Sequence, residues 1–143
     1  MAELSAEDIQ GHWRLTDWVQ QYDDGRAVRA FGEKPNGVIS YFGGRMCALI
    51  SAEDHAAFTT GGQWNADIHE KARAYEEMLA YGGTYEYDGS IMQHHVDISL
   101  FPNWVGITQR RRVEWDGEKL RLTARLEEGT SEARTAILEW IRA

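Results

Sequence analysis

Short turn signals recur along this chain and divide it into brief segments whose side chains alternate between apolar and polar. Asp-Gly and Gly-Gly pairs favour the tight turns of β-hairpins, because they accept the positive φ that those turns need. A chain divided in this way can fold as an antiparallel meander. The signals are Asp23-Asp24-Gly25, Pro35-Asn36-Gly37, Gly43-Gly44, Gly61-Gly62, Gly82-Gly83, Asp88-Gly89, Asp116-Gly117 and Glu128-Gly129.

The segments between these signals predict eight strands, a common number for a small closed barrel. Hairpins are expected across Gly43-Gly44, Asp88-Gly89 and Asp116-Gly117. The predicted fold is therefore all-β: an eight-stranded antiparallel up-and-down barrel with one or two short helices, forming one domain over residues 1–143. In the first strand we expect Trp13, Leu15 and Val19 to share a face. The expected strands are residues 12–21, 38–42, 45–51, 84–87, 90–100, 108–115, 119–127 and 134–141.

Two helical segments are expected to interrupt the meander. Ser51-Ala52-Glu53-Asp54 is a weak capping signal for a short helix that reaches about Phe58. A stronger pattern predicts a helix over residues 67–80, with Asp67 as its N-cap and Gly82-Gly83 after its end. The helix would lay one apolar stripe across a mouth of the barrel. The stripe consists of Ile68, Ala72, Tyr75 and Leu79.

Charge and cysteine content exclude several classes of protein. A net charge of −8 is unsuited to nucleic acid or to an anionic membrane surface, since both attract clustered lysine and arginine. Cys47 is the only cysteine, which excludes an internal disulfide and fits a reducing compartment. The N-terminus shows no signal-peptide pattern, so we expect a cytoplasmic protein.

No metal or cofactor is expected from the motifs. His12, His55 and His69 lie on different predicted elements, and no pair shows the spacing of metal ligands. The chain also lacks a glycine-rich phosphate loop and a nucleophile elbow. The sequence leaves open whether the protein forms a homo-oligomer.

Adjacent histidines at 94 and 95 must point to opposite faces of their strand, because side chains alternate. His94 shares the more apolar face, on which it is either a hydrogen-bonded core residue or the polar element of a ligand pocket. His95 and Asp97 share the solvated face as an incidental pair; if the faces were inverted, they would become an oriented base instead. The apolar face also carries Met92, Val96, Ile98 and Leu100.

Arg111 is the second candidate for chemistry. It shares a strand face with Gln109, Val113 and Trp115, which indicates that its guanidinium points inward. A buried arginine must be paired or must bind an anionic or carbonyl oxygen. The more usual alternative is a pair with Asp97 or Glu86 that merely ties strands together.

Aromatic residues supply the remaining candidates. Tyr85 and Tyr87 share a face and could offer hydroxyls, although cross-strand aromatic packing is the favoured interpretation. Pro102 lacks a backbone donor, so the strand should break there and place Trp104 at a barrel rim. Trp104 would then act as a plug of the barrel end or as a lid over a pocket, and the plug is favoured.

Several runs of the chain carry a resemblance to a known family. These runs are Gly11-His12-Trp13-Arg14-Leu15, Asp24-Gly25-Arg26, Phe31-Gly32-Glu33, Tyr81-Gly82-Gly83-Thr84-Tyr85-Glu86, the segment from His94 to Gly106, and Gln109-Arg110-Arg111. They resemble the bacterial and fungal lipocalin-like domain family, although Asp97 stands where the family often shows glutamate. The resemblance implies a small antiparallel barrel whose lumen holds an apolar molecule, and related barrels in natural-product biosynthesis act as isomerases or cyclases.

Together these observations predict a pocket for a small, largely apolar, oxygenated molecule. In an enzyme, His94 would be neutral at pH 7 and move a proton, and Arg111 would stabilise an oxyanion during cofactor-free isomerisation, cyclisation or hydration. A non-catalytic carrier or sensor would use the same pocket. An interaction module without a ligand would instead have a filled lumen. The expected ligand-binding residues are Gln109, Tyr85, Tyr87, Trp104, Asn103 and Met92.

Overall fold

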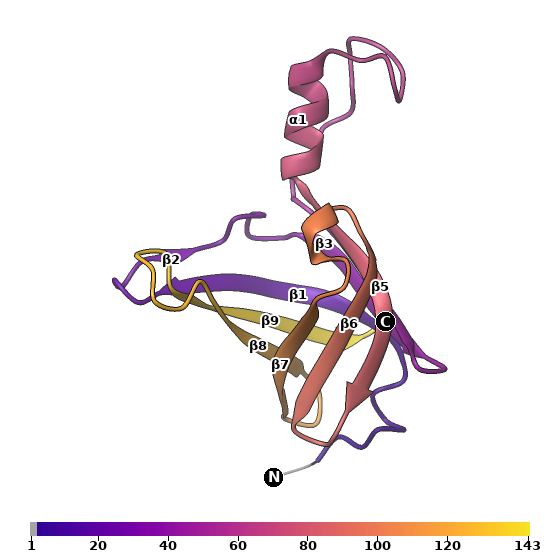
Figure 1. Ribbon diagram of the computed structural model, residues 1–143, viewed down its shortest axis with the longest axis vertical. Coiled ribbons are helices and arrows are strands. Elements are labelled where there is room, and N and C mark those ends of the chain that lie inside the picture. The colour runs from indigo at the N-terminus through magenta and orange to yellow at the C-terminus, as the bar shows by residue number, and fades with distance from the viewer. Residues whose placement is uncertain (1–2) are drawn as a thin grey trace.

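The chain folds as a closed antiparallel β-barrel, and the computed structural model describes residues 3–143. Apart from one two-residue strand that pairs only with the first, consecutive strands are hydrogen-bonded neighbours, and the first strand also pairs with the last, which closes a ring of eight (Figure 1). The predicted all-β barrel and its three hairpins are confirmed; only the two-residue β2 was not expected. The strands are β1 (Gly11–Tyr22), β2 (Ala27–Val28), β3 (Asn36–Phe42), β4 (Arg45–Ser51), β5 (Met78–Tyr87), β6 (Ile91–Ser99), β7 (Thr108–Trp115), β8 (Leu120–Leu126) and β9 (Arg134–Arg142).

The helix α1 (Ile68–Glu76) begins where the sequence predicts but ends earlier. The Asp67 side chain caps it by accepting a hydrogen bond of 2.8 Å from the backbone N–H of His69. The prediction that it reaches Ala80 is wrong, because residues from Met78 onward pair with β4, where Ala80 lies opposite Leu49. Cross-strand pairing and the burial of Tyr81 outweigh the local helical pattern.

The prediction that this helix covers a barrel mouth is also wrong. α1 stands away from the end of the barrel, beyond β4 and β5 (Figure 1), and none of its residues is buried. Ile68, Ala72 and Tyr75 are exposed, and of the expected stripe only Leu79 faces the interior, from β5. No helix within residues 3–143 is long and apolar enough to cross a membrane.

The short helix expected from Ser51 to Phe58 does not form. The expected cap, Ser51, is instead the last residue of β4 and pairs with Met78. The residues after it are tied to distant segments: the N–H of Ala52 donates to the Glu77 carbonyl at 2.8 Å, and the N–H of Glu53 donates to the Phe31 carbonyl at 2.9 Å.

Two β-bulges change which side chains face the lumen. In β1 the register against β9 shifts between Leu15 and Asp17. Trp13 and Leu15 share a buried face, but beyond the bulge Trp18 lines the interior, so the prediction that Val19 shares the face of Trp13 and Leu15 is wrong. The sequence pattern could not show this one-residue insertion.

The second bulge lies between Gly82 and Gly83 of β5, opposite β6. It explains why Met92, His94 and Val96 are buried as predicted, whereas Ile98 is 66% exposed and Leu100 39% exposed, contrary to prediction. The strands approach closely here: a Cβ on Gly83 would lie 1.9 Å from the carbonyl oxygen of His95. Only glycine fits this position.

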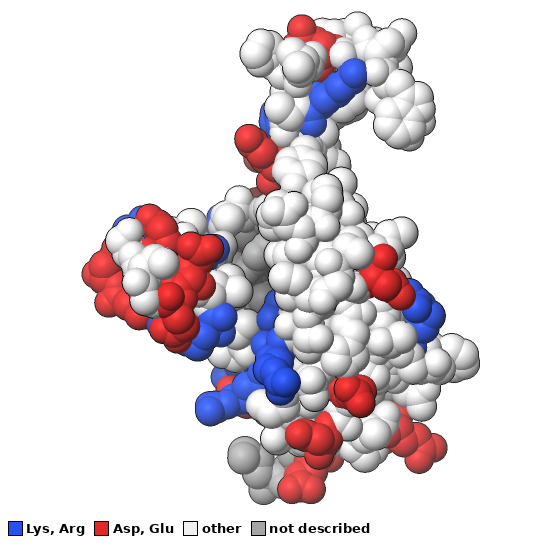
Figure 2. Space-filling view, in the orientation of Figure 1, with Lys and Arg blue, Asp and Glu red and all other residues white. Residues whose placement is uncertain are grey.

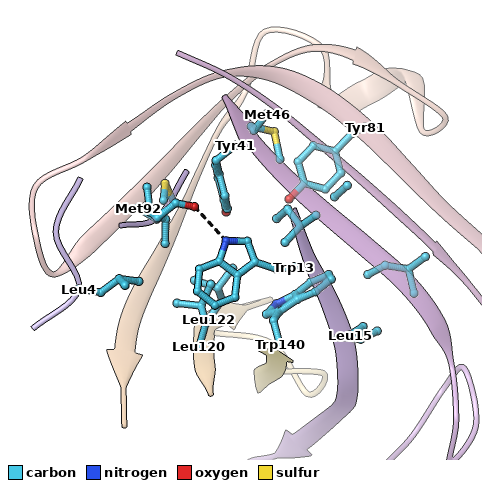
Figure 3. Close-up of a cluster of buried hydrophobic side chains, with 14 of the residues drawn as sticks. Leu4, Trp13, Leu15, Tyr41, Met46, Tyr81, Met92, Leu120, Leu122 and Trp140 are labelled. Atoms are coloured by element: carbon cyan, nitrogen blue, oxygen red, sulfur yellow. Dashed lines mark hydrogen bonds between the residues drawn. The ribbon is translucent and has the colours of Figure 1, made fainter. Parts of the chain in front are cut away.

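The N-terminal segment seals one end of the barrel. The indole N–H of Trp13 donates to the Ile9 carbonyl at 2.9 Å, and the Tyr87 hydroxyl donates to the Leu4 carbonyl at 2.6 Å. Trp13 is fully buried at the centre of the core, with Tyr41 on one side and Leu120, Leu122 and Trp140 on the other (Figure 3).

At the opposite end the barrel wall parts between β7 and β8. These strands pair only over four residues each, from Arg112↔Thr123 to Trp115↔Leu120. The remainder of β8 pairs with β9 alone, and β1 pairs with β3 only as far as Arg14. The far halves of β1, β8 and β9, with β2, therefore lean away as a separate lobe (Figure 1), and a hollow lies between this lobe and the rest of the barrel (Figure 2).

Candidate ligand-binding cavity

A cavity of about 220 Å³ occupies the lumen below this opening. This is somewhat smaller than the roughly 300 to 1,000 Å³ of most drug-sized ligand sites, so its occupant must be small. Most of the wall is aliphatic or aromatic, from Ile39 and Ile50 on one side to Leu122 and Leu138 on the other. The polar side chains in the wall are Gln20, Tyr81, His94, Arg111 and Arg134.

A larger hollow of about 340 Å³ lies outside the sealed end, against Leu4, Tyr87 and Trp115. Of the residues predicted to bind a ligand it contains only Tyr87, whose hydroxyl already bonds to Leu4. The lumen is the better candidate, because it is enclosed and it gathers His94, Arg111 and Trp104. Among the described residues, no group of three His, Cys, Asp or Glu side chains could hold a metal ion.

His94 lies between two tyrosine hydroxyls, one from β3 and one from β5. Its Nε2 lies 2.7 Å from the Tyr41 hydroxyl of β3, and its Nδ1 lies 2.8 Å from the Tyr81 hydroxyl of β5. A neutral imidazole has one donor and one acceptor nitrogen, so one tyrosine donates to the ring and the other accepts from it. His94 is thus a hydrogen-bonded core residue that also lies in the wall of the cavity.

Burial sets the protonation state of this group. It lowers the pKa of His94 to about 3, and the nearby Arg111 guanidinium acts in the same direction. Burial also raises the pKa of the Tyr41 and Tyr81 hydroxyls, against the opposing effect of Arg111. At neutral pH the imidazole is neutral, as predicted, and both phenols are protonated.

Arg111 lines the cavity without a carboxylate partner. Its guanidinium donates to Gln109 Oε1 at 2.7 Å and to the backbone carbonyl of Arg110 at 3.0 Å. Within residues 3–143 no aspartate or glutamate oxygen lies within 4.0 Å of it.

The expected alternative, a pair between Arg111 and Asp97 or Glu86, is wrong. Asp97 is bound by Arg45 at 2.8 Å, and Glu86 contacts His95 at 2.6 Å. Both carboxylates lie on the outer surface, where the His95 ring also meets the Thr108 hydroxyl at 2.7 Å. The expected His95–Asp97 pair is therefore wrong as well.

Two further predicted residues support the cavity wall from behind. Gln109 is buried, lies directly opposite His94 in the β6–β7 ladder, and orients Arg111 through its side-chain oxygen. Tyr85 is half-buried and packs edge-on against Tyr41 with ring centroids 4.9 Å apart, which matches the favoured packing interpretation.

The other predicted binding residues divide between the core, the sealed end and the mouth. Met92 is fully buried in the core, and Tyr87 fastens the N-terminal segment. Asn103 is exposed on the 3₁₀ helix η1 (Pro102–Trp104) and is not part of the wall. Trp104 lies in the same turn, is half-buried, lines the cavity, and meets Tyr81 edge-on with centroids 5.5 Å apart. The predicted strand break at Pro102 is confirmed.

Several wall residues were not foreseen. Trp18 and Trp140 line the cavity, and within the described part of the chain neither indole N–H has a hydrogen-bond acceptor. Trp140 is only 1% exposed. Tyr81 was not predicted to line the cavity because its segment resembled the end of a helix. Trp140, and Tyr41 behind His94, lie at inward positions of predicted strands, so the alternation of side chains alone could have identified them.

These features define a small closed antiparallel barrel with an enclosed, mostly apolar cavity that is open to solvent at one end. The chain belongs to the lipocalin-like domain family, whose sequence model matches residues 10–143. No curated protein matches the sequence. A crystal structure of an uncharacterized protein from Bacteroides eggerthii aligns over 95% of this chain and 100% of its own, with 14% identity and a TM-score of 0.46. The lipocalin-like fold suits the binding of a small molecule.

Proposed function

We propose that this protein reversibly binds a small, largely apolar, oxygenated organic molecule in its lumen. The observation that carries the proposal is the cavity of about 220 Å³ in the lumen, whose wall is mostly aliphatic and aromatic but includes Tyr81, His94 and Arg111. A few polar groups in an apolar wall are what orients an oxygenated ligand. The aliphatic walls would hold the apolar body of the ligand.

The geometry favours binding over proton transfer by His94. Both of its ring nitrogens are engaged by tyrosine hydroxyls, and its pKa of about 3 makes it a weak base at neutral pH. A general base works best with a pKa near the working pH. The carrier or sensor interpretation therefore has the stronger support. An interaction module with a filled lumen has less, because the lumen contains a cavity.

Native mass spectrometry of the purified protein tests the proposal, together with titration by Nile red, a neutral dye that fluoresces in apolar surroundings. We expect a retained small molecule, or a saturable dye signal at one site. Ala136→Leu fills the cavity and should abolish both, because Ala136 is buried in its wall. Ala72→Leu on the exposed face of α1 is the control. Equal dye binding by both variants would refute the proposal.

A further inference from the structure

The cavity wall carries a charge opposite to that of the protein as a whole. The chain has 23 acidic and 15 basic residues and a net charge of −8. Nevertheless, the described wall contains two arginines, Arg111 and Arg134, and neither aspartate nor glutamate. Figure 2 shows Lys or Arg side chains at the lower edge of the hollow, next to a lobe that carries many Asp and Glu side chains. The inversion of sign in the wall itself attracts anions.

Both arginines of the wall are bonded to neutral oxygens only. Arg111 donates to the Gln109 amide and to a backbone carbonyl, as described above. Arg134 donates to the Gln20 side-chain oxygen and, at 3.0 Å, to the Glu132 carbonyl. Among residues 3–143 neither guanidinium has a carboxylate within 4.0 Å.

Some of the exposed arginines elsewhere on the barrel have carboxylate partners, and others, such as Arg110 and Arg112, have none within 4.0 Å among the described residues. Arg45, Arg121 and Arg125 each meet a carboxylate at 2.8 Å or less on the outer surface. The half-buried arginines of the cavity have more need of a counter-ion than these exposed ones, because the surrounding apolar wall solvates a charge poorly. Their charge is therefore available to a ligand.

Two donors of the wall are unpaired within residues 3–143, and the Tyr81 hydroxyl keeps acceptor capacity besides its bond to His94. The indole N–H groups of Trp18 and Trp140 lack acceptors in the described part of the chain, and an indole can only donate. The Gln20 oxygen is occupied by Arg134, and the His94 nitrogens are occupied by Tyr41 and Tyr81. A ligand group that accepts several hydrogen bonds and carries negative charge meets all these conditions.

We infer that the ligand is a small organic carboxylate, bound with its carboxylate group at Arg111 and its apolar body against the aliphatic wall. The inference rests on the proposed function. Arginine matches a carboxylate with two parallel hydrogen bonds. A phosphate monoester has the same geometry but a larger charge, which this small and mostly apolar cavity would desolvate at greater cost. The carboxylate is therefore the better fit.

Isothermal titration calorimetry with matched probes tests the inference. The probes are octanoate with octan-1-ol and octyl phosphate, and 3-phenylpropionate with 3-phenylpropan-1-ol. In at least one series the carboxylate should bind about tenfold or more tightly than its alcohol, as expected for charge-assisted hydrogen bonds. The carboxylate should also bind more tightly than the phosphate.

Variants of one strand supply the control. Arg111→Met should remove the preference for the carboxylate, Arg111→Lys should retain part of it, and Arg112→Met should leave it unchanged because Arg112 is exposed on the other face. If Arg111→Met does not fold, the preference for the carboxylate is compared between Arg111→Lys and the wild type instead. It should be smaller in Arg111→Lys, since lysine keeps the charge but loses the two parallel hydrogen bonds.

The outcomes separate the two proposals. The carboxylate proposal would be overturned by any of three results: alcohols that bind as tightly as the acids, a phosphate that binds more tightly than the carboxylate, or a retained molecule without an acidic group. The proposal that the protein binds a small molecule would survive each of them. An undiminished preference in Arg111→Met would overturn the assignment to Arg111. If no probe binds and native mass spectrometry retains nothing, both proposals fail.

Discussion

His94 and Arg111 occupy diagonal positions on two neighbouring strands, and both side chains line the same cavity. His94 lies opposite Gln109, and Arg111 lies opposite Met92, two positions further along the β6–β7 ladder. A guanidinium beside an imidazole favours the neutral form of the ring. The two tyrosines satisfy that neutral ring, and no carboxylate among residues 3–143 neutralises Arg111.

The stability of the protein should decrease between pH 7 and pH 5 because of His94. Its pKa is about 3 in the folded protein and near 6.5 when unfolded, so below pH 6.5 the unfolded chain takes up a proton that the folded protein does not. Stability is therefore full above pH 6.5 and is lost as the pH falls toward 3. We expect the free energy of unfolding to fall by about 2 kcal/mol from pH 7 to pH 5.

Urea denaturation at several pH values measures this slope. His94→Gln should remove most of it, since glutamine can bond to both tyrosines without titrating. His95→Gln, on the outer face of the same strand, should keep it. An unchanged slope in His94→Gln would show that the buried imidazole is not its source.

Removing the Arg111 charge should affect stability less than breaking a buried ion pair. A partner lost from a buried ion pair costs about 3 to 5 kcal/mol, because the other charge stays buried alone. Arg111 has only neutral partners among residues 3–143, so Arg111→Met leaves no carboxylate stranded. It does leave the buried Gln109 oxygen without its donor, so we expect a loss of about 1 to 2 kcal/mol in urea denaturation. A loss above 3 kcal/mol would indicate that the guanidinium holds the barrel together instead of serving a ligand.

Gly83→Ala should destabilise the protein by about 3 kcal/mol or more, as judged by thermal and urea denaturation. The new Cβ would lie 1.9 Å from the carbonyl oxygen of His95, so β5 and β6 must separate beside His94. Gly62→Ala is the matched control, because its Cβ would meet only the flexible Asn65 side chain, at 3.2 Å. Similar losses in the two variants would mean that the close approach at Gly83 can relax.

The alternation of side chains predicted most of the barrel and the central part of the cavity. It holds without interruption along β7, so the inward positions of Gln109 and Arg111 follow from their spacing. It also places His94 inside, because the bulge in this part of the sheet lies beyond Val96. Local periodicity succeeds wherever the pairing register is regular.

The sequence could not reveal features that depend on distant contacts. The bulge after Leu15, which turns Trp18 into the cavity, leaves no mark in the residue pattern. The helix-like spacing up to Leu79 hid a strand that forms only because β4 offers it a partner. The group formed by Tyr41, His94 and Tyr81 joins three strands, and no local signal links its members.

Trp104 lines the cavity, and its replacement distinguishes a lid over the cavity from a plug of the barrel end. The ring is half-buried, lines the cavity and rests edge-on against Tyr81 and Phe101, with centroids 5.5 and 5.7 Å away. A fully buried tryptophan that plugs the barrel would cost about 3 to 5 kcal/mol on truncation to alanine. A half-buried ring loses less apolar contact, so we expect Trp104→Ala to cost about 1 to 2 kcal/mol in urea denaturation.

The same variant should weaken binding of Nile red, or of the carboxylate probes, by about tenfold, because loss of one well-packed aromatic contact on a ligand costs roughly 1 to 2 kcal/mol. Trp64→Ala is the control, since that side chain is 80% exposed on the loop before α1 and should change neither measurement. A stability loss above 3 kcal/mol with unchanged affinity would identify Trp104 as a plug. If both measurements stay unchanged, Trp104 has neither role, and the ligand enters without touching it.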